Sequence, residues 1–136
     1  MTESAEGTLA TGGGWFDRVN LGAVDCVDAV AHDGVGTIRF ARLASDDDTA
    51  GTCKFIDLAV LPPGASIGRH RHEIDEEEFY LVLDGTGMMW RDGVEFEVTI
   101  GDLVRNTPGG AHGLVNSGAS DLRVFVFEVV VAGAPS

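Results

Sequence analysis

The chain has 136 residues, of which 44% are hydrophobic and 23% are charged, so it is long enough for one hydrophobic core and too short for two. Its formal net charge at pH 7 is −13, because 22 acidic residues stand against 9 basic ones. A charge of this sign repels phosphate backbones and anionic membrane surfaces, so neither nucleic acid nor membrane is an expected partner.

The two cysteines, Cys26 and Cys53, stand alone, without the spacing of a metal or redox motif, and are expected to be reduced. The segment 1–14 has neither the basic nor the apolar region of a secretory signal. No apolar run approaches the roughly 18 residues that a membrane span requires. We therefore expect a cytoplasmic protein.

Residues 1–14 are small, polar and glycine-rich, which predicts a flexible tail, and a single domain is predicted over residues 15–136. In the following stretch Val24, Val27 and Val30 recur three residues apart. This pattern is too short and too interrupted to predict a helix.

From residue 35 onward, short runs rich in Val, Ile, Leu, Phe and Thr alternate with clusters of Gly, Pro, Asn and Asp. This rhythm is typical of an antiparallel barrel or sandwich, and no segment has the length and 3.6-residue period of a helix. The chain is therefore predicted to be all-β. The predicted strands are 35–44, 53–61, 66–72, 78–84, 87–91, 94–99, 103–107, 112–116 and 122–131.

Two histidines, His70 and His72, flank Arg71 on a predicted strand. Residues i and i+2 of a strand point to the same face about 6 to 7 Å apart, so both imidazoles can reach one metal ion. The acidic run 76–78 leads directly into the next predicted strand and offers a carboxylate as a further ligand. The alternative is a pair of surface histidines followed by a solvated acidic loop.

The spacing of these residues resembles the first motif of the cupin superfamily, Gly-x5-His-x-His-x3or4-Glu-x6-Gly. Gly64 is followed after five residues by His70 and then His72, and Glu78 lies six residues before Gly85. The second cupin motif, Gly-x5-Pro-x-Gly-x2-His-x3-Asn, is similar to the segment 101–116, which carries Gly101, Gly109, His112 and Asn116 and has Thr107 in place of the proline.

The first motif departs from the family pattern in one place, because five residues separate His72 from Glu78. Counting forward from His72 favours Glu76 or Glu77 as the ligand, whereas counting back from Gly85 favours Glu78. We choose Glu78 and keep Glu77 as its alternative, since a one-residue slip along a strand turns the side chain to the opposite face.

The resemblance implies a single cupin double-stranded β-helix, or jelly-roll barrel, with motif 1 at 64–85 and motif 2 at 101–116. It also implies one divalent metal ion, bound by His70, His72, Glu78 and His112. A mixed nitrogen and oxygen donor set suits iron, manganese, nickel or zinc.

Strand alternation places Tyr80 and Val82 on the face of Glu78, and Leu114 and Asn116 on the face of His112, so all four are expected to line the cavity. Tyr80 is the candidate catalytic residue, and the alternative is that it only packs. His32 matches neither motif and is expected to be a surface residue.

The expected function is that of a metal-dependent enzyme whose small organic substrate chelates the metal, either a dioxygenase or a Lewis-acid isomerase, cyclase or lyase. The alternative is a non-catalytic cupin that binds a small ligand and has a structural metal. A homodimer is expected, because antiparallel barrels leave edge strands that need cover, and the family resemblance points the same way.

Overall fold

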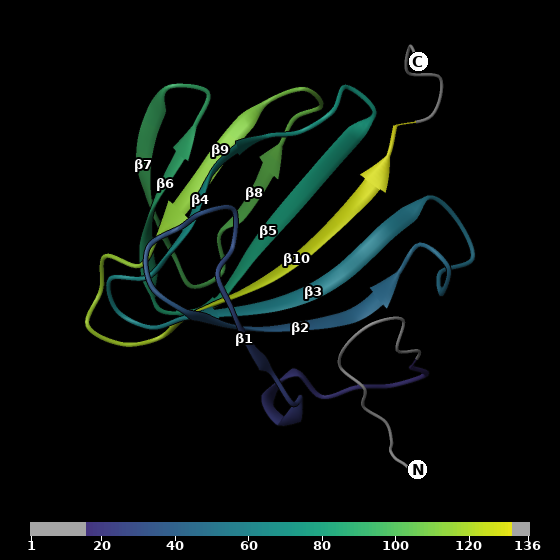
Figure 1. Cartoon of the computed structure of the whole chain (residues 1–136), viewed down its shortest axis with the longest axis horizontal. Helices are drawn as coiled ribbons and strands as arrows, with labels where there is room; N and C mark the ends of the chain where they lie inside the picture. The colour runs from purple at the N-terminus through teal and green to yellow at the C-terminus, as the bar shows by residue number, and fades with distance from the viewer. Residues whose placement is uncertain (1–15, 132–136) are drawn as a thin grey trace.

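The computed structural model describes residues 16–131, so the predicted flexible tail and residues 15 and 132–136 of the predicted domain lie outside the described residues. Ten strands form two antiparallel sheets that face each other (Figure 1). Among the described residues the only helical segment is a single 3-10 turn, η1 (Leu21–Ala23), and no helix could cross a membrane. The all-β jelly-roll prediction is confirmed.

The larger sheet has six strands and the smaller sheet has four. In spatial order the larger sheet contains β1 (Val27–Ala29), β2 (Ile38–Ser45), β3 (Cys53–Leu61), β10 (Leu122–Val130), β5 (Glu76–Asp84) and β8 (Leu103–Asn106). The smaller sheet contains β4 (Ser66–Arg71), β9 (Ala111–Val115), β6 (Thr86–Arg91) and β7 (Val94–Thr99).

All nine predicted strands are present, and β3 and β7 have the predicted bounds. The short edge strand β1 was not predicted. It pairs with β2 through Val27 opposite Phe40, and its side chains are largely exposed. A strand of three residues on a sheet edge leaves no alternating pattern of apolar residues in the sequence.

The main core lies between the two sheets and is built by alternation along the strands. In β10 the side chains of Leu122, Val124 and Val126 point inward and are almost fully buried, while Phe125 and Phe127 point to the opposite face. Each fully buried aliphatic side chain contributes about 1.5 to 3 kcal/mol through the hydrophobic effect.

A second apolar cluster lies on the outer face of the larger sheet. Leu58 and Val60 of β3 belong to it, and the half-buried side chains of Phe16 and Leu21 pack against it. The segment before β1 therefore covers the outside of β2 and β3, which explains why β3 is buried on both faces over its second half.

The loop between β1 and β2 is tied to β4 by hydrogen bonds. The Gly68 amide donates to the Ala31 carbonyl at 3.0 Å, and the Ser66 amide donates to the Val35 carbonyl at 2.8 Å. The Ser66 hydroxyl in turn accepts from the Val35 amide at 2.7 Å. A Cβ atom at Gly68 would overlap the carbonyl oxygen of His32, so this close approach requires glycine.

We predict that Gly68→Ala lowers the free energy of unfolding by about 1 to 3 kcal/mol, because the added methyl forces the loop away from β4. Urea unfolding measures the change. Gly51→Ala is the control, since a Cβ there meets nothing within 4 Å, and it should stay within about 0.5 kcal/mol of the unsubstituted protein. Equal stabilities for the two variants would contradict the described contact.

Candidate metal centre

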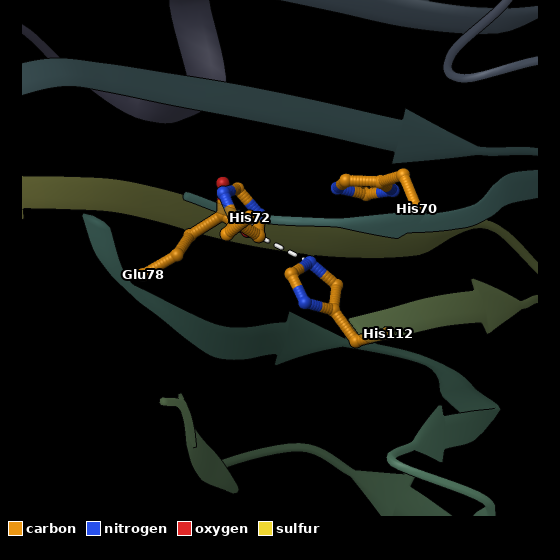
Figure 2. Close-up of side chains that lie close together, drawn as sticks. All are labelled: His70, His72, Glu78 and His112. Atoms are coloured by element: carbon orange, nitrogen blue, oxygen red, sulfur yellow. Dashed lines mark hydrogen bonds and ion pairs between the residues drawn. The ribbon is translucent and has the colours of Figure 1, made fainter. Parts of the chain in front are cut away.

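The four side chains that the sequence predicted as ligands meet between the two sheets (Figure 2). One donor atom from each of them lies within 4.8 Å of the others. His70 of β4 is directly opposite His112 of β9 in the smaller sheet, His72 follows β4, and Glu78 comes from β5 of the larger sheet. The cluster therefore joins the two layers.

Glu78 is the most central member of this cluster. Its side chain is buried, and Oε1 lies 2.8 Å from His112 Nε2 and 3.0 Å from His72 Nε2. Glu77 points the other way, where its Oε2 accepts a hydrogen bond from Arg105 at 3.1 Å. The register of β5 thus brings Glu78 to the histidines and turns Glu77 away from them.

Opposite charges in the cluster stabilise the ionised forms of Glu78 and His72. Burial raises the pKa of Glu78, but its hydrogen bonds with His112 and His72 outweigh burial and hold the pKa at about 2. Burial lowers the pKa of His72, but its contacts with Glu128 and Glu78 outweigh burial and raise the pKa to about 10. A buried carboxylate of this kind is stable only beside positive charge, which a bound metal ion also supplies.

His70 is oriented by the backbone. Its Nδ1 lies 2.8 Å from the Gly68 carbonyl oxygen, an acceptor, so Nδ1 carries the proton and Nε2 keeps its lone pair. Burial is the main reason why the pKa of His70 falls to about 4, which leaves the ring neutral near pH 7. A neutral imidazole with a free Nε2 is the form that ligates a metal.

His32 is closer to this centre than the sequence predicted. Its ring is exposed but stacks on the ring of His70, with centroids 3.5 Å apart and planes 8° apart, and it lines the cavity. His32 has a φ of 51° and the next residue, Asp33, has a φ of 57°, so the loop adopts a left-handed conformation that favours glycine. Backbone pairing with β4 holds this loop in place, and no sequence motif marks it.

Tyr80 lies beside the cluster, and its side chain is buried. Its hydroxyl oxygen is 3.3 Å from His112 Nε2, and its ring meets the His112 ring edge to face. Burial raises the pKa of the phenol well above its ordinary value, so the hydroxyl keeps its proton near neutral pH. The structure thus shows Tyr80 both packed and in polar contact with the cluster.

The prediction that Val82, Leu114 and Asn116 line the cavity is wrong. Val82 and Leu114 belong to the main core, and the Asn116 amide donates to the carbonyls of Leu61 and Ser120, each at 2.8 Å. Strand alternation correctly places Val82 and Leu114 on the inner face of their sheets, but there they pack in the core between the two sheets and do not reach the cavity.

A cavity of about 550 Å³ opens beside the cluster, a size typical of small-molecule sites. His70, His72 and Glu78 contribute to its wall, whereas His112 is fully buried behind them. The remaining wall is part apolar and part charged and includes Phe40, Phe55, Arg42, Asp57 and Glu128.

Arg42 and Asp57 form a bidentate ion pair in this wall. Arg42 Nε donates to Asp57 Oδ1 at 2.8 Å and Nη2 donates to Oδ2 at 3.0 Å, while the guanidinium lies 4.6 Å from the centre of the Phe55 ring. Burial raises the pKa of Asp57 to about 6, although the hydrogen bonds with Arg42 oppose it. No motif in the sequence marks this pair, although each member interrupts an apolar strand.

A jelly roll with three histidines and a glutamate gathered between its two sheets is typical of the cupin class. Residues 57–129 match the family described as Cupin domain. Over 98 residues the chain is 33% identical to an oxalate-binding protein from Thermotoga maritima, a match that covers 72% of this chain and 80% of the relative. The chain belongs to the cupin family, which confirms the resemblance seen in its motifs.

One further relative and two solved structures are informative. The chain is 35% identical over 89 residues to dimethylsulfoniopropionate lyase DddW of Ruegeria pomeroyi, covering 65% of this chain and 56% of that protein. A T. maritima structure described as a predicted oxalate decarboxylase superposes with a TM-score of 0.79 and 26% identity, covering 84% of this chain and 99% of that one. A sugar phosphate isomerase from Silicibacter pomeroyi, at 21% identity and a TM-score of 0.65, shares the fold.

The neighbouring carboxylates Glu78 and Glu77 offer a matched test of the cluster. We predict that Glu78→Gln weakens Mn(II) or Zn(II) binding by more than about 100-fold, because even partners outside the ligand set cost 10- to 100-fold when removed. Glu77→Gln should leave the affinity unchanged. Isothermal titration of the metal-stripped proteins measures both, and equal losses in the two variants would contradict the described register.

Proposed function

We propose that the chain binds one divalent metal ion through His70, His72, Glu78 and His112, and that the ion binds a small organic acid of the oxalate class. The observation that carries this proposal is the buried Glu78 carboxylate, which faces imidazoles at the wall of a cavity of about 550 Å³. A donor set of three nitrogens and one oxygen suits iron, manganese, nickel or zinc.

The ligand class follows from what such a site leaves open. Four protein ligands leave one or two positions on a five- or six-coordinate ion, and a carboxylate fills them well. When bound, the metal would supply Lewis acidity or, as a redox-active ion, dioxygen activation. The protein would surround the ligand with the apolar side chains of Phe40 and Phe55 and the cationic side chains of Arg42 and Arg71.

The relatives support an acid as the ligand. The T. maritima relative is named an oxalate-binding protein, and the match covers most of its length. A water molecule occupies about 30 Å³ of the liquid, so a cavity of about 550 Å³ has room for many molecules of that size. It is therefore larger than a molecule as small as oxalate requires. Organic acids with a longer carbon chain therefore also fit the proposed site.

We predict saturable binding of oxalate, one molecule per chain, to the metal-loaded protein and no binding after chelator treatment. Isothermal titration with oxalate, malonate, succinate and acetate measures the affinity and the ligand length that the cavity prefers. The Glu78→Gln variant, treated with the same metal, is the negative control. Equal oxalate affinity with and without metal would contradict the proposal.

A second candidate function is catalysis on the bound acid, and the position of Tyr80 favours it. A protonated hydroxyl buried 3.3 Å from His112 can donate a hydrogen bond or a proton to a ligand in the cavity that it lines. The relative from R. pomeroyi is named a lyase, which is one of the reaction classes expected from the sequence. The others are an isomerase or cyclase reaction and a dioxygenation. The alternative is a binding protein with the same site and no turnover.

We predict that Tyr80→Phe lowers kcat by about 100-fold or more and leaves the metal affinity unchanged, because it removes only the hydroxyl. Product analysis and dioxygen uptake with a panel of organic acids supply the rates. Full activity in Tyr80→Phe would exclude Tyr80 as the catalytic residue. A metal-loaded protein that binds acids without converting any of them would favour the non-catalytic alternative.

The homodimer expected from the sequence stays a prediction. The outer face of the larger sheet carries three half-buried aromatic side chains, Phe79, Phe125 and Phe127. Phe79 stacks on Phe127, and the Phe125 ring is tilted with its centre 5.9 Å from that of Phe127, so this row could pack against a second copy. A monomer mass in light scattering would contradict the dimer.

A further inference from the structure

His72 lies between two carboxylates that belong to adjacent strands. Its Nε2 is 3.0 Å from Glu78 Oε1, and its Nδ1 is 3.0 Å from Oε1 of Glu128 on β10. Glu128 and Glu78 are directly opposite each other in the register of β10 and β5, so both side chains point to the inner face. Glu128 lies 12 positions after Asn116, the last residue of the second motif, and is therefore outside both motifs.

Glu128 is 2% exposed, and a carboxylate at this depth is stable only beside positive charge or a hydrogen-bond donor. Its Oε1 faces His72, and its Oε2 lies 3.8 Å from Nζ of Lys54 on β3. Lys54 also donates to Glu76 Oε2 at 2.7 Å, and Glu76 Oε1 lies 3.3 Å from His72 Nδ1. Three charged side chains, from β3, β5 and β10, thus lie on the side of the His72 ring that faces away from Glu78.

We propose that Glu128 is a positioning residue, which holds the Nδ1 side of His72 so that Nε2 points into the metal centre. The proposal rests on the metal-binding function proposed above. A carboxylate on the second ring nitrogen of a ligating histidine fixes its tautomer and ring orientation and increases its basicity. Glu76 and Lys54 complete the arrangement, because the ammonium group offsets part of the negative charge of the two carboxylates.

The same residues do not form a second metal site. His72, Glu76 and Glu128 have donor atoms within 4.8 Å of one another, as a metal site requires. The Lys54 ammonium, however, already lies 2.7 Å from Glu76 and 3.8 Å from Glu128, and it would repel a second cation there. The group therefore serves His72.

The test compares Glu128→Gln and Glu128→Ala with the unsubstituted protein, and Glu77→Gln is the control for loss of one carboxylate from the same sheet. Co(II) is the probe, because its visible absorption spectrum reports the geometry of its ligands. Titration of the metal-stripped proteins gives the affinity, and circular dichroism without metal shows whether each variant is folded. Glu128→Gln keeps the size of the side chain in case Glu128→Ala fails to fold.

We expect Glu128→Ala to bind Co(II) about 10- to 100-fold more weakly and to change the spectrum. Glu128→Gln should fall between Glu128→Ala and the unsubstituted protein, because its amide oxygen can take the place of Oε1 beside Nδ1 of His72 but carries no full negative charge. Glu77→Gln should match the unsubstituted protein in both measurements.

Three results would overturn the positioning role. Unchanged affinity and spectrum in both Glu128 variants would show that His72 needs no partner, while the metal site itself would stand. Weaker binding with an unchanged spectrum would show that Glu128 acts only through its charge. An unsubstituted protein that does not bind Co(II) or any other divalent metal would overturn the proposed function together with this inference.

Discussion

The contact between the buried Glu78 carboxylate and the imidazoles of His72 and His112 is the constraint on which the rest of the site depends. A carboxylate enclosed between two sheets is stable only if the surrounding side chains compensate its charge. Here they come from the opposite sheet, so the contact also joins the two layers of the jelly roll. The same contact that holds the two sheets together thus gathers the side chains that could bind a metal ion.

The surroundings of the cluster fix its members one by one. The Gly68 carbonyl orients His70, and the loop tied to β4 places the ring of His32 against it. Glu128 contacts the far side of His72. All four histidines of the chain therefore gather at one end of a cavity whose other walls are built from β2, β3 and β10.

Much of this arrangement could be predicted from the sequence, because alternation in strands is a strong signal. The spacing of His70 and His72 places both on one face, and counting back from Gly85 selects Glu78, the glutamate that the structure brings to the histidines. Val82 shows the limit of alternation, which gives the face of a side chain but not its depth between the sheets.

Glu128 and His32 could not be placed in this way. In β10 both faces carry apolar side chains, Val126 on one and Phe127 on the other. The sequence therefore does not reveal whether Glu128 points to the inner or the outer face of the sheet. The loop that carries His32 is held by backbone hydrogen bonds, which leave no pattern of side chains.

Anomalous diffraction from crystals grown with Mn(II) or Zn(II) tests the central claim most directly. The account predicts one peak within about 2.0 to 2.3 Å of a nitrogen of His70, His72 and His112 and of an oxygen of Glu78. A peak elsewhere, or no peak with the contact between Glu78 and His72 intact, would contradict it.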